Sequence, residues 1–402
     1  MNTNTICGIP REEYLERVQR VQEEMKKEGL DAIIAFGHAA EPQYLRYFAD
    51  FRVSFETGGV AIPAVGDAAL LIGPETLERA QMSNPLRHTL KMLAMRELAA
   101  PRYEDPTADT FEELFKRFQQ DRPLKKVGVA GWRLVPMDLF REMENALRLI
   151  SPQAEWVPAD GVVDCVRAQK SAAELKLIRK SAQIARQTLE YVISQLRVGM
   201  TGEQLRGIAL GKMIELGAED EAFPIWITRQ EQTEFAINLS CKEAFQPGDL
   251  VQIQIGASVQ GYCSACGRPV VLGRADSATR GLIEACIAAK RAAESALATA
   301  RTSSEVAREH REAVVALGRE DSLVYGPCHG VGLVECEAPW IELGADFPLK
   351  PGMAFCADIF LQDRSLHRGV RYEDMLLITE DGIERLTGMT DEVLEILPDA
   401  MG

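Results

Sequence analysis

The segment PGDLVQIQIG, residues 247–256, has the pattern of a turn followed directly by a strand. Pro, Gly and Asp in succession are typical of a tight turn. From Leu250 to Gly256 apolar and polar residues alternate, which is the period of a strand. A second strand signal, Tyr262–Leu272, follows, so we expect two neighbouring strands with Gln252 and Gln254 on one face.

Helices are expected on both sides of these strands. The period of three and four residues predicts a helix over Ala172–Leu196, and Thr201 with Gln204 has the spacing of a capping box that opens the next one. Further elements are predicted at Ser277–Ala300 and Ser304–Leu317 (helices), and at Ala354–Leu361 and Met375–Ile378 (strands). Because strands and helices are grouped, this part of the chain reads as an α+β domain over residues 166–398.

The first part of the chain has a different organisation, with strands and helices in alternation. The predicted helices are Arg11–Leu30, Phe111–Phe118 and Met137–Leu149, and the predicted strands are Ala32–Phe36, Val60–Pro63, Ala68–Ile72 and Lys126–Ala130. This order indicates an α/β domain over residues 8–160.

Composition narrows the class of protein. The 402 residues are 46% hydrophobic and 26% charged, as in a globular protein with a core, and carry a formal charge of −15. So acidic a chain disfavours nucleic acid and anionic membranes as partners. Its apolar runs are shorter than the roughly 20 residues of a membrane span, and the N-terminus lacks the pattern of a signal peptide. Nine cysteines, an odd number, then predict reduced thiols and a cytoplasmic protein.

Several short motifs occur in one order along the chain: Gln43–Phe48, Arg167–Ala182, Pro247–Gly256, Gly261–Arg268, Cys328–Gly332, Glu337–Pro339, Pro351–Met353 and Gly369–Asp374. Together they resemble the creatinase/prolidase, or pita-bread, family, which includes methionine aminopeptidase and aminopeptidase P. The resemblance covers nearly the whole chain. It implies a creatinase-like α/β N-terminal domain followed by a pita-bread α+β catalytic domain.

The resemblance also implies a pattern of metal ligands, from which this chain departs. Peptidases of the family hold two divalent ions with two Asp, one His and two Glu. The aspartate positions here are Gln254 and Ala265, while His329, Asp358 and Glu373 occupy the others. A neutral amide is a weak ligand and a methyl group is none. We therefore expect no metal and no cofactor; one weakly held ion on the three remaining residues is the alternative.

His329, Asp358 and Glu373 are the candidate catalytic residues, together with Cys336. Two carboxylates in one pocket push one pKa upward, as a general acid or base at neutral pH requires. The structural alternative is an ion pair of Glu373 with Arg371 or Arg268. Cys336 stands where the family has a second histidine and would pair with His329 as nucleophile and base, or else be a small buried hydrophobic residue.

The remaining candidates would bind substrate. Arg371 is expected to hold an anionic group, and Gln254, Asn238 and Cys263 to shape the pocket. Because family dimers place an N-terminal loop over the neighbouring site, Arg52 is a candidate that acts in trans. Cys263 does not form a metal pair with Cys266, since residues three apart on a strand point to opposite faces.

These residues favour a metal-independent hydrolase that cleaves a C–N bond, of amide or amidine type, in a small polar molecule. Two alternatives stay open: an Xaa-Pro dipeptidase or aminopeptidase with an atypical metal site, and a non-catalytic binding or scaffold protein. We expect a small-molecule substrate and a homodimer.

Overall fold

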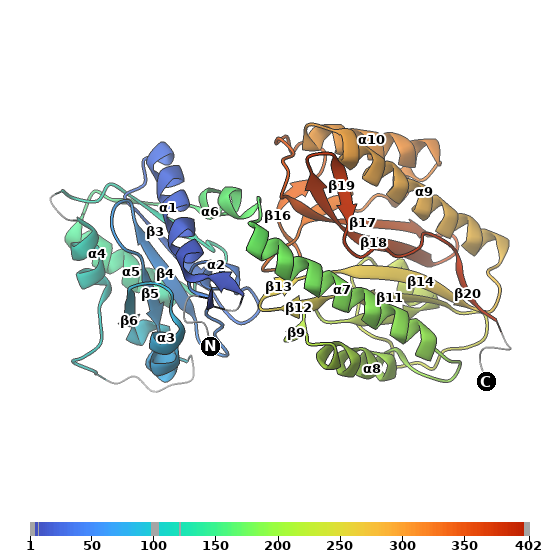
Figure 1. Cartoon of the computed structure of the whole chain (residues 1–402), viewed down its shortest axis with the longest axis horizontal. Coiled ribbons are helices and arrows are strands. Elements are labelled where there is room, and N and C mark those ends of the chain that lie inside the picture. The colour runs from blue at the N-terminus through green and yellow to red at the C-terminus, as the bar shows by residue number, and fades with distance from the viewer. Residues whose placement is uncertain (1–4, 7, 98–103, 120–121, 398–402) are drawn as a thin grey trace. The chain divides into compact units, whose positions relative to one another are not determined.

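The structure is a computed structural model that describes residues 5–6, 8–97, 104–119 and 122–397. Contacts within the chain divide it into two compact units, Met1–Arg167 and Ala168–Gly402. Each unit has a large sheet of its own (Figure 1). Each also has its own apolar core. The candidate catalytic residues all belong to the second unit.

Unit 1 is built on a six-stranded sheet of order β6-β5-β4-β3-β7-β8. Its central strand, β3, is buried at every residue and pairs antiparallel with β4 and parallel with β7, as in an α/β layer. The strands are β3 (Ala32–Gly37), β4 (Gly58–Pro63), β5 (Ala69–Ile72), β6 (His88–Lys91), β7 (Lys126–Ala130) and β8 (Glu155–Pro158), and a short pair, β1 (Thr5–Ile6) and β2 (Ile9–Pro10), lies outside the sheet.

The helices of unit 1 confirm the three predicted and add three shorter ones. The first predicted helix ends at Glu28 because Gly29 adopts a positive φ of 67°, the usual cap at a helix C-terminus. The helices are α1 (Arg11–Glu28), α2 (Gln43–Ala49), α3 (Leu77–Ser83), α4 (Phe111–Gln119), α5 (Met137–Ile150) and α6 (Asp160–Arg167), with short 3-10 turns at Pro74–Thr76 and Leu93–Met95.

Unit 2 contains a nine-stranded sheet whose main path is β10-β11-β14-β18-β17-β15-β16, with β19 beside β18 and β20 beside β14. β18 runs over twelve residues, far beyond the predicted Met375–Ile378, so both Arg371 and Glu373 lie inside a strand. The strands are β10 (Trp226–Arg229), β11 (Leu250–Ile255), β14 (Cys266–Leu272), β15 (Cys328–Gly330), β16 (Glu337–Ile341), β17 (Ala354–Asp363), β18 (Arg368–Thr379), β19 (Gly382–Arg385) and β20 (Leu394–Ile396).

Four long helices cover this sheet. Capping boxes open three of them: Ser171 with Glu174 at α7, the predicted Thr201 with Gln204 at α8, and Thr302 with Glu305 at α10. Figure 1 shows α9 beside β17 and β18, and α10 beside α9. Leu282 and Ile283 of α9 share one apolar cluster with Ile359 of β17. The helices are α7 (Ala172–Gln195), α8 (Gly202–Glu215), α9 (Ser277–Thr299) and α10 (Ser303–Ala316), with 3-10 turns at Gln230–Glu234 and Glu320–Ser322.

The predicted strand Tyr262–Leu272 is wrong in one respect, because it is interrupted. Ser264 hydrogen-bonds through its hydroxyl to both the N–H and the carbonyl of Ala257, at 3.2 and 3.1 Å. Ser264 and Ala265 therefore leave the ladder, and the first piece joins a separate three-stranded sheet. That sheet has the order β13 (Tyr262–Cys263), β12 (Ala257–Val259) and β9 (Asp220–Glu221). Cys263 and Cys266 therefore lie on different strands, and the alternation of faces along a single strand cannot be counted from one to the other.

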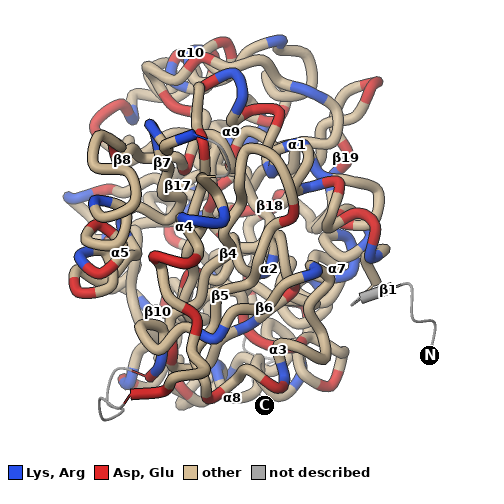
Figure 2. Tube along the Cα trace, turned by 90° about the vertical axis from the view of Figure 1, so that its left-hand side faces the viewer, with Lys and Arg blue, Asp and Glu red and all other residues tan. Residues whose placement is uncertain are grey.

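Charged residues of both signs are interspersed along the surface helices. In α10, for example, Glu305, Arg308 and Glu309 follow one another closely, and Figure 2 shows both colours along this helix. Among the described residues no helix has the length and apolar character needed to cross a membrane.

Candidate functional site

The register of three neighbouring strands gathers the predicted catalytic residues. His329 on β15 lies opposite Cys356 on β17, and Asp358 on β17 lies opposite Glu373 on β18. Residues that are paired across antiparallel strands share a face, and Cys356 and Asp358 are two positions apart on one strand. All four side chains therefore stand on the same face, and all four residues are buried.

His329 is held between two carboxylates. Its Nε2 lies 3.3 Å from Oε1 of Glu335 and 3.8 Å from Oε1 of Glu373. Its Nδ1 lies 3.0 Å from the carbonyl of Gly330, to which the ring N–H donates. Burial lowers the pKa of His329, but Glu335 and Glu373 outweigh it and raise the pKa to about 10. Without another cation, the imidazole is protonated at neutral pH.

Glu335 is the functional candidate that the sequence analysis missed. It lies on the loop between β15 and β16, next to Cys336. Cys336 was a candidate only because the family has a histidine at that position. Burial, with the charges of Glu373 and Asp358, raises the pKa of Glu335 to about 7. The available signal was a carboxylate directly after the apolar stretch 331–334, a few residues from His329.

The predicted ion pair of Glu373 with Arg371 or Arg268 is wrong for the described residues, because both arginines pair with other carboxylates. Nη1 of Arg371 lies 3.3 Å from Oδ2 of Asp358, while Arg268 bonds to Asp374 and to the backbone of Glu373. Arg371 also donates to the carbonyl of Ala236. Its guanidinium lies 5.5 to 5.7 Å from the ring centroids of three aromatic residues: Trp226, Phe360 and Tyr325. Burial raises the pKa of Asp358, and Arg371 opposes that rise.

Gln254 contacts the site from β11. Its Nε2 donates to Oε2 of Glu373 over 3.4 Å, and its carboxamide fills the space above Gly267. A Cβ at residue 267 would stand 1.2 Å from Oε1 of Gln254, so only glycine leaves room for this arrangement. Oε1 of Gln254 and Oε1 of Glu373 are both buried and have no hydrogen-bond partner.

This set of donors does not fit the two-ion centre that the resemblance implied. Ala265 offers no ligand atom, Gln254 offers an amide whose N–H₂ faces the remaining glutamate, and Asp358 is engaged by Arg371. Two adjacent divalent ions need several anionic oxygens between them. Among the described residues, the four whose ligand atoms all lie within 4.8 Å of one another are His329, Glu335, Cys356 and Glu373.

Cys336 does not take the predicted position beside His329. In the described part of the chain it is Glu335 that faces Nε2, and Cys336 is exposed. Partial desolvation of the sulfur and the charge of Glu335 raise the pKa of the Cys336 thiol, which disfavours the thiolate that a nucleophile needs.

The predicted pocket-shaping residues have mainly local contacts. Asn238 donates through its side-chain amide to the carbonyl of Gln232 at 2.9 Å and so stabilises its own loop. Cys263 is buried, with Sγ 3.5 Å from the carbonyl of Gly261. Arg52 belongs to unit 1, where its side chain is exposed and its carbonyl accepts from Arg79.

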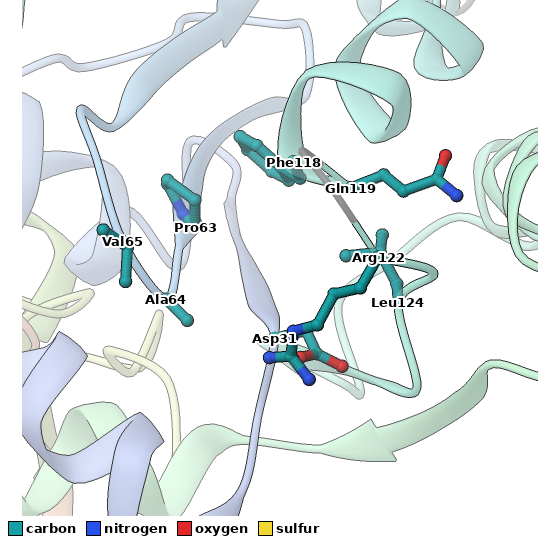
Figure 3. A pocket seen from close by; sticks show the side chains of 8 residues that line it. All are labelled: Asp31, Pro63, Ala64, Val65, Phe118, Gln119, Arg122 and Leu124. Carbon is teal, nitrogen blue, oxygen red and sulfur yellow. The ribbon is translucent and has the colours of Figure 1, made fainter.

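Unit 1 has a hollow of its own, shown in Figure 3, between Pro63–Val65 and the end of α4. Its one carboxylate, Asp31, already accepts from the guanidinium of Arg122 at 2.8 Å and from two backbone N–H groups, those of Lys125 and Lys126. The contacts give Asp31 a structural role at the start of β7.

Comparison with known proteins agrees with this fold and with the order of the motifs. Residues 176–380 match the metallopeptidase family M24, and residues 17–169 match the creatinase/prolidase N-terminal domain. The chain belongs to the M24 family. It therefore has the creatinase-like N-terminal domain and the pita-bread catalytic domain of that family.

Individual M24 relatives are distant in sequence but similar over their full length. An Xaa-Pro dipeptidase of Pyrococcus furiosus is 26% identical over 94% of this chain and 99% of its own. Among solved structures, the dipeptidase PepE of Mycobacterium ulcerans has a TM-score of 0.80 at 20% identity, covering 96% of this chain and 98% of that one. The Xaa-Pro dipeptidase of Bacillus anthracis has a TM-score of 0.79 at 21% identity, covering 95% and 100%. These relatives are peptidases by name, which favours the dipeptidase alternative over metal-independent hydrolysis.

Proposed function

We propose that this protein hydrolyses the amide bond of a small dipeptide-like molecule of the Xaa-Pro type. The observation that carries the proposal is the group of His329, Glu335 and Glu373, with Nε2 of the histidine between the two carboxylates. The names of the relatives supply the class of substrate.

Each residue of the group has a chemical task in this proposal. Glu335, with a pKa of about 7, takes a proton from water or gives one to the leaving amine near neutral pH. His329 holds Glu335 in place and stabilises its charged form. Glu373, fixed by Gln254, faces the same imidazole nitrogen as Glu335 does and orients the ring.

Arg371 would bind the carboxylate of the substrate. Asp358 and the carbonyl of Ala236 fix one side of the guanidinium, and the aromatic rings around it exclude water. A guanidinium pairs well with a carboxylate, especially where water is excluded. Arg371 then places the C-terminal end of a dipeptide near the group formed by His329 and Glu335. Asp358 supports this role by positioning Arg371.

A second candidate is the metal-independent cleavage of a non-peptide C–N bond, such as that of an amidine. It is favoured by Ala265 and by the amide of Gln254, which together remove two anionic ligands from the site. The reaction would use the same residues as acid and base. A scaffold protein is the third alternative, and it requires no turnover at all.

A substrate panel tests these possibilities. It should contain Xaa-Pro dipeptides, other dipeptides, small amides, guanidino acids and ring-closed amidines. On the active substrate, Glu373→Gln and His329→Asn should each lower kcat by roughly 10²–10⁴-fold, the usual loss when a positioned acid or base is removed. The double variant should be little worse than either single one, because residues that act as a unit are not additive.

The matched control is Glu380→Gln, the same change at an exposed residue after β18, which should retain full activity. Near-complete turnover by Glu373→Gln would show that the site is wrongly assigned. Turnover of amidines but not of dipeptides would replace the first candidate with the second.

A further inference from the structure

We infer that the side chains of His329, Glu335, Cys356 and Glu373 form a site for a single divalent cation of the Zn²⁺, Co²⁺ or Fe²⁺ type. The ligand set differs from the one that the family resemblance implies, because Glu335 and Cys356 stand at positions outside that pattern. The inference goes beyond the proposed function, and cation binding can be measured without a substrate.

The first argument is distance. The four ligand atoms all lie within 4.8 Å of one another, with Nε2 of His329 at 3.3 Å from Glu335 and 3.8 Å from Glu373. Metal–ligand bonds of about 2.0–2.3 Å give tetrahedral edges of roughly 3.3–3.8 Å. Two of the edges therefore already have the length that an ion requires, and the others need small side-chain movements.

The second argument is the orientation of the imidazole. Metal-binding histidines usually donate their other ring N–H to a carbonyl or carboxylate, which directs the free nitrogen to the ion. Nδ1 of His329 has such a partner in the carbonyl of Gly330, at 3.0 Å. Nε2 is consequently the nitrogen that faces Glu335 and Glu373.

The third argument is the state of Glu373. Gln254 occupies Oε2, whereas Oε1 is buried without a hydrogen-bond partner and faces Nε2 of His329. A buried carboxylate oxygen without a donor is costly. Two carboxylates face one imidazole here, and a divalent ion would balance both charges.

The fourth argument concerns which ion would bind. Cys356 is fully buried opposite His329, so the donor set is one nitrogen, one sulfur and two oxygens. Thiolate and imidazole suit Zn²⁺, Co²⁺ and Fe²⁺, whereas Mg²⁺ and Mn²⁺ prefer oxygen alone. Glu335, on a loop with its side chain 19% exposed, is the most accessible of the four and the ligand that solvent would most easily replace.

The test uses the full chain, stripped with a chelator and then titrated with Co²⁺ alone. We expect one ion per chain by calorimetry and elemental analysis, together with a thiolate-to-cobalt charge-transfer absorption. Cys356→Ser should abolish that absorption, whereas Cys336→Ser, the nearby exposed thiol, should retain it. Glu335→Gln should weaken Co²⁺ binding by about 10-fold or more, since even changes beside a ligand cost 10–100-fold.

Three results would overturn the inference: no Co²⁺ bound, two ions bound with similar affinity, or an absorption that depends on Cys336 and persists in Cys356→Ser. Should Cys356→Ser fail to fold, Glu335→Gln decides the matter, because it changes only a loop residue. Unchanged affinity in that variant would exclude Glu335 as a ligand. The substrate panel is a separate measurement, so the proposed function can fail while the cation site stands, and the reverse.

Discussion

Gln254 and Glu373 lie on different strands of one sheet, and the amide of the first donates to the carboxylate of the second at 3.4 Å. The contact depends on Gly267, the residue of β14 that is paired with both of them. Through it, a neutral side chain, at the position where the family resemblance implies an aspartate, fixes the orientation of Glu373. Gln254 therefore determines which oxygen of Glu373 is hydrogen-bonded and which is left to face His329.

Gly267→Ala should disturb this arrangement. Its new Cβ would overlap Oε1 of Gln254, which is fully buried and has little space to move. Overpacking of this kind costs about 1–3 kcal/mol, so the free energy of unfolding should fall by that amount in urea. In a Gln254→Ala background the same change should cost much less, because the obstructing carboxamide is gone.

Gly281→Ala is the matched control. Gly281 lies in α9, and a Cβ there would meet nothing within 4 Å. Alanine is the better helix former, so this variant should gain roughly 0.5–1 kcal/mol. If Gly267→Ala costs the same with and without Gln254, the two residues are not coupled as the structure indicates.

The second prediction concerns the buried charge cluster around Lys290, which includes Asp374, the residue after Glu373. Lys290 is fully buried and lies 2.8–2.9 Å from three carboxylates, those of Glu294, Asp374 and Asp391. Lys290→Met would leave these charges without their shared partner, and breaking a buried pair typically costs about 3–5 kcal/mol. Chemical denaturation of the wild type and the variant measures the loss.

An exposed ion pair supplies the comparison. Arg179 and Glu384 are 45% and 41% exposed, and such pairs contribute at most about 1 kcal/mol. Arg179→Met should therefore unfold close to the wild type. Equal effects of the two substitutions would mean that burial does not set the strength of the Lys290 cluster.

The fold was predictable from the sequence because its signals are local. The helix α7 begins at a capping box, and the strand β7 is a short apolar run with the predicted bounds, Lys126–Ala130. The predictions failed where side chains far apart in sequence decide the structure. Ser264 ends a strand by bonding to Ala257, and no periodicity in residues 262–272 reveals that contact.

The candidate site was predictable only in part. The register of β15, β17 and β18 brings His329, Asp358 and Glu373 together, as the order of the motifs implied. Glu335 was missed because a loop residue has no period by which its direction can be counted. The partner of Arg371 could not be chosen either, since Asp358 and Glu373 are directly opposite each other and both lie within reach of its strand.

The third prediction is a homodimer of about 89 kDa, twice the 44.5 kDa chain, measured by light scattering at micromolar concentration. A two-fold pair is the commonest closed assembly. The N-terminal loop expected at the dimer interface lies around Arg52, where three phenylalanines occur. Phe48 and Phe51 are core residues, and Phe55 is 79% exposed. Phe55→Ser should therefore weaken the dimer, whereas Val65→Ser, at a residue of unit 1 that is 71% exposed, should not. A wild-type mass near 45 kDa would contradict the prediction.

The last prediction is a pH dependence that originates outside the candidate site. His310 of α10 is 3% exposed, its Nε2 has no hydrogen-bond partner, and burial lowers its pKa to about 4. In the unfolded chain the pKa of histidine is about 6.5, so the unfolded state binds more protons between these two values. Stability from this residue is therefore complete above about pH 6.5 and is lost as the pH falls towards 4. The full difference corresponds to about 3 kcal/mol of unfolding free energy.

His310→Leu removes the titrating group, so the free energy of unfolding of this variant should decline less between pH 7 and about pH 4.5 than that of the wild type. Val306→Ala, a buried change on the same helix, should lower stability equally at both pH values. Parallel losses in wild type and His310→Leu would show that the histidine is not kept neutral by burial.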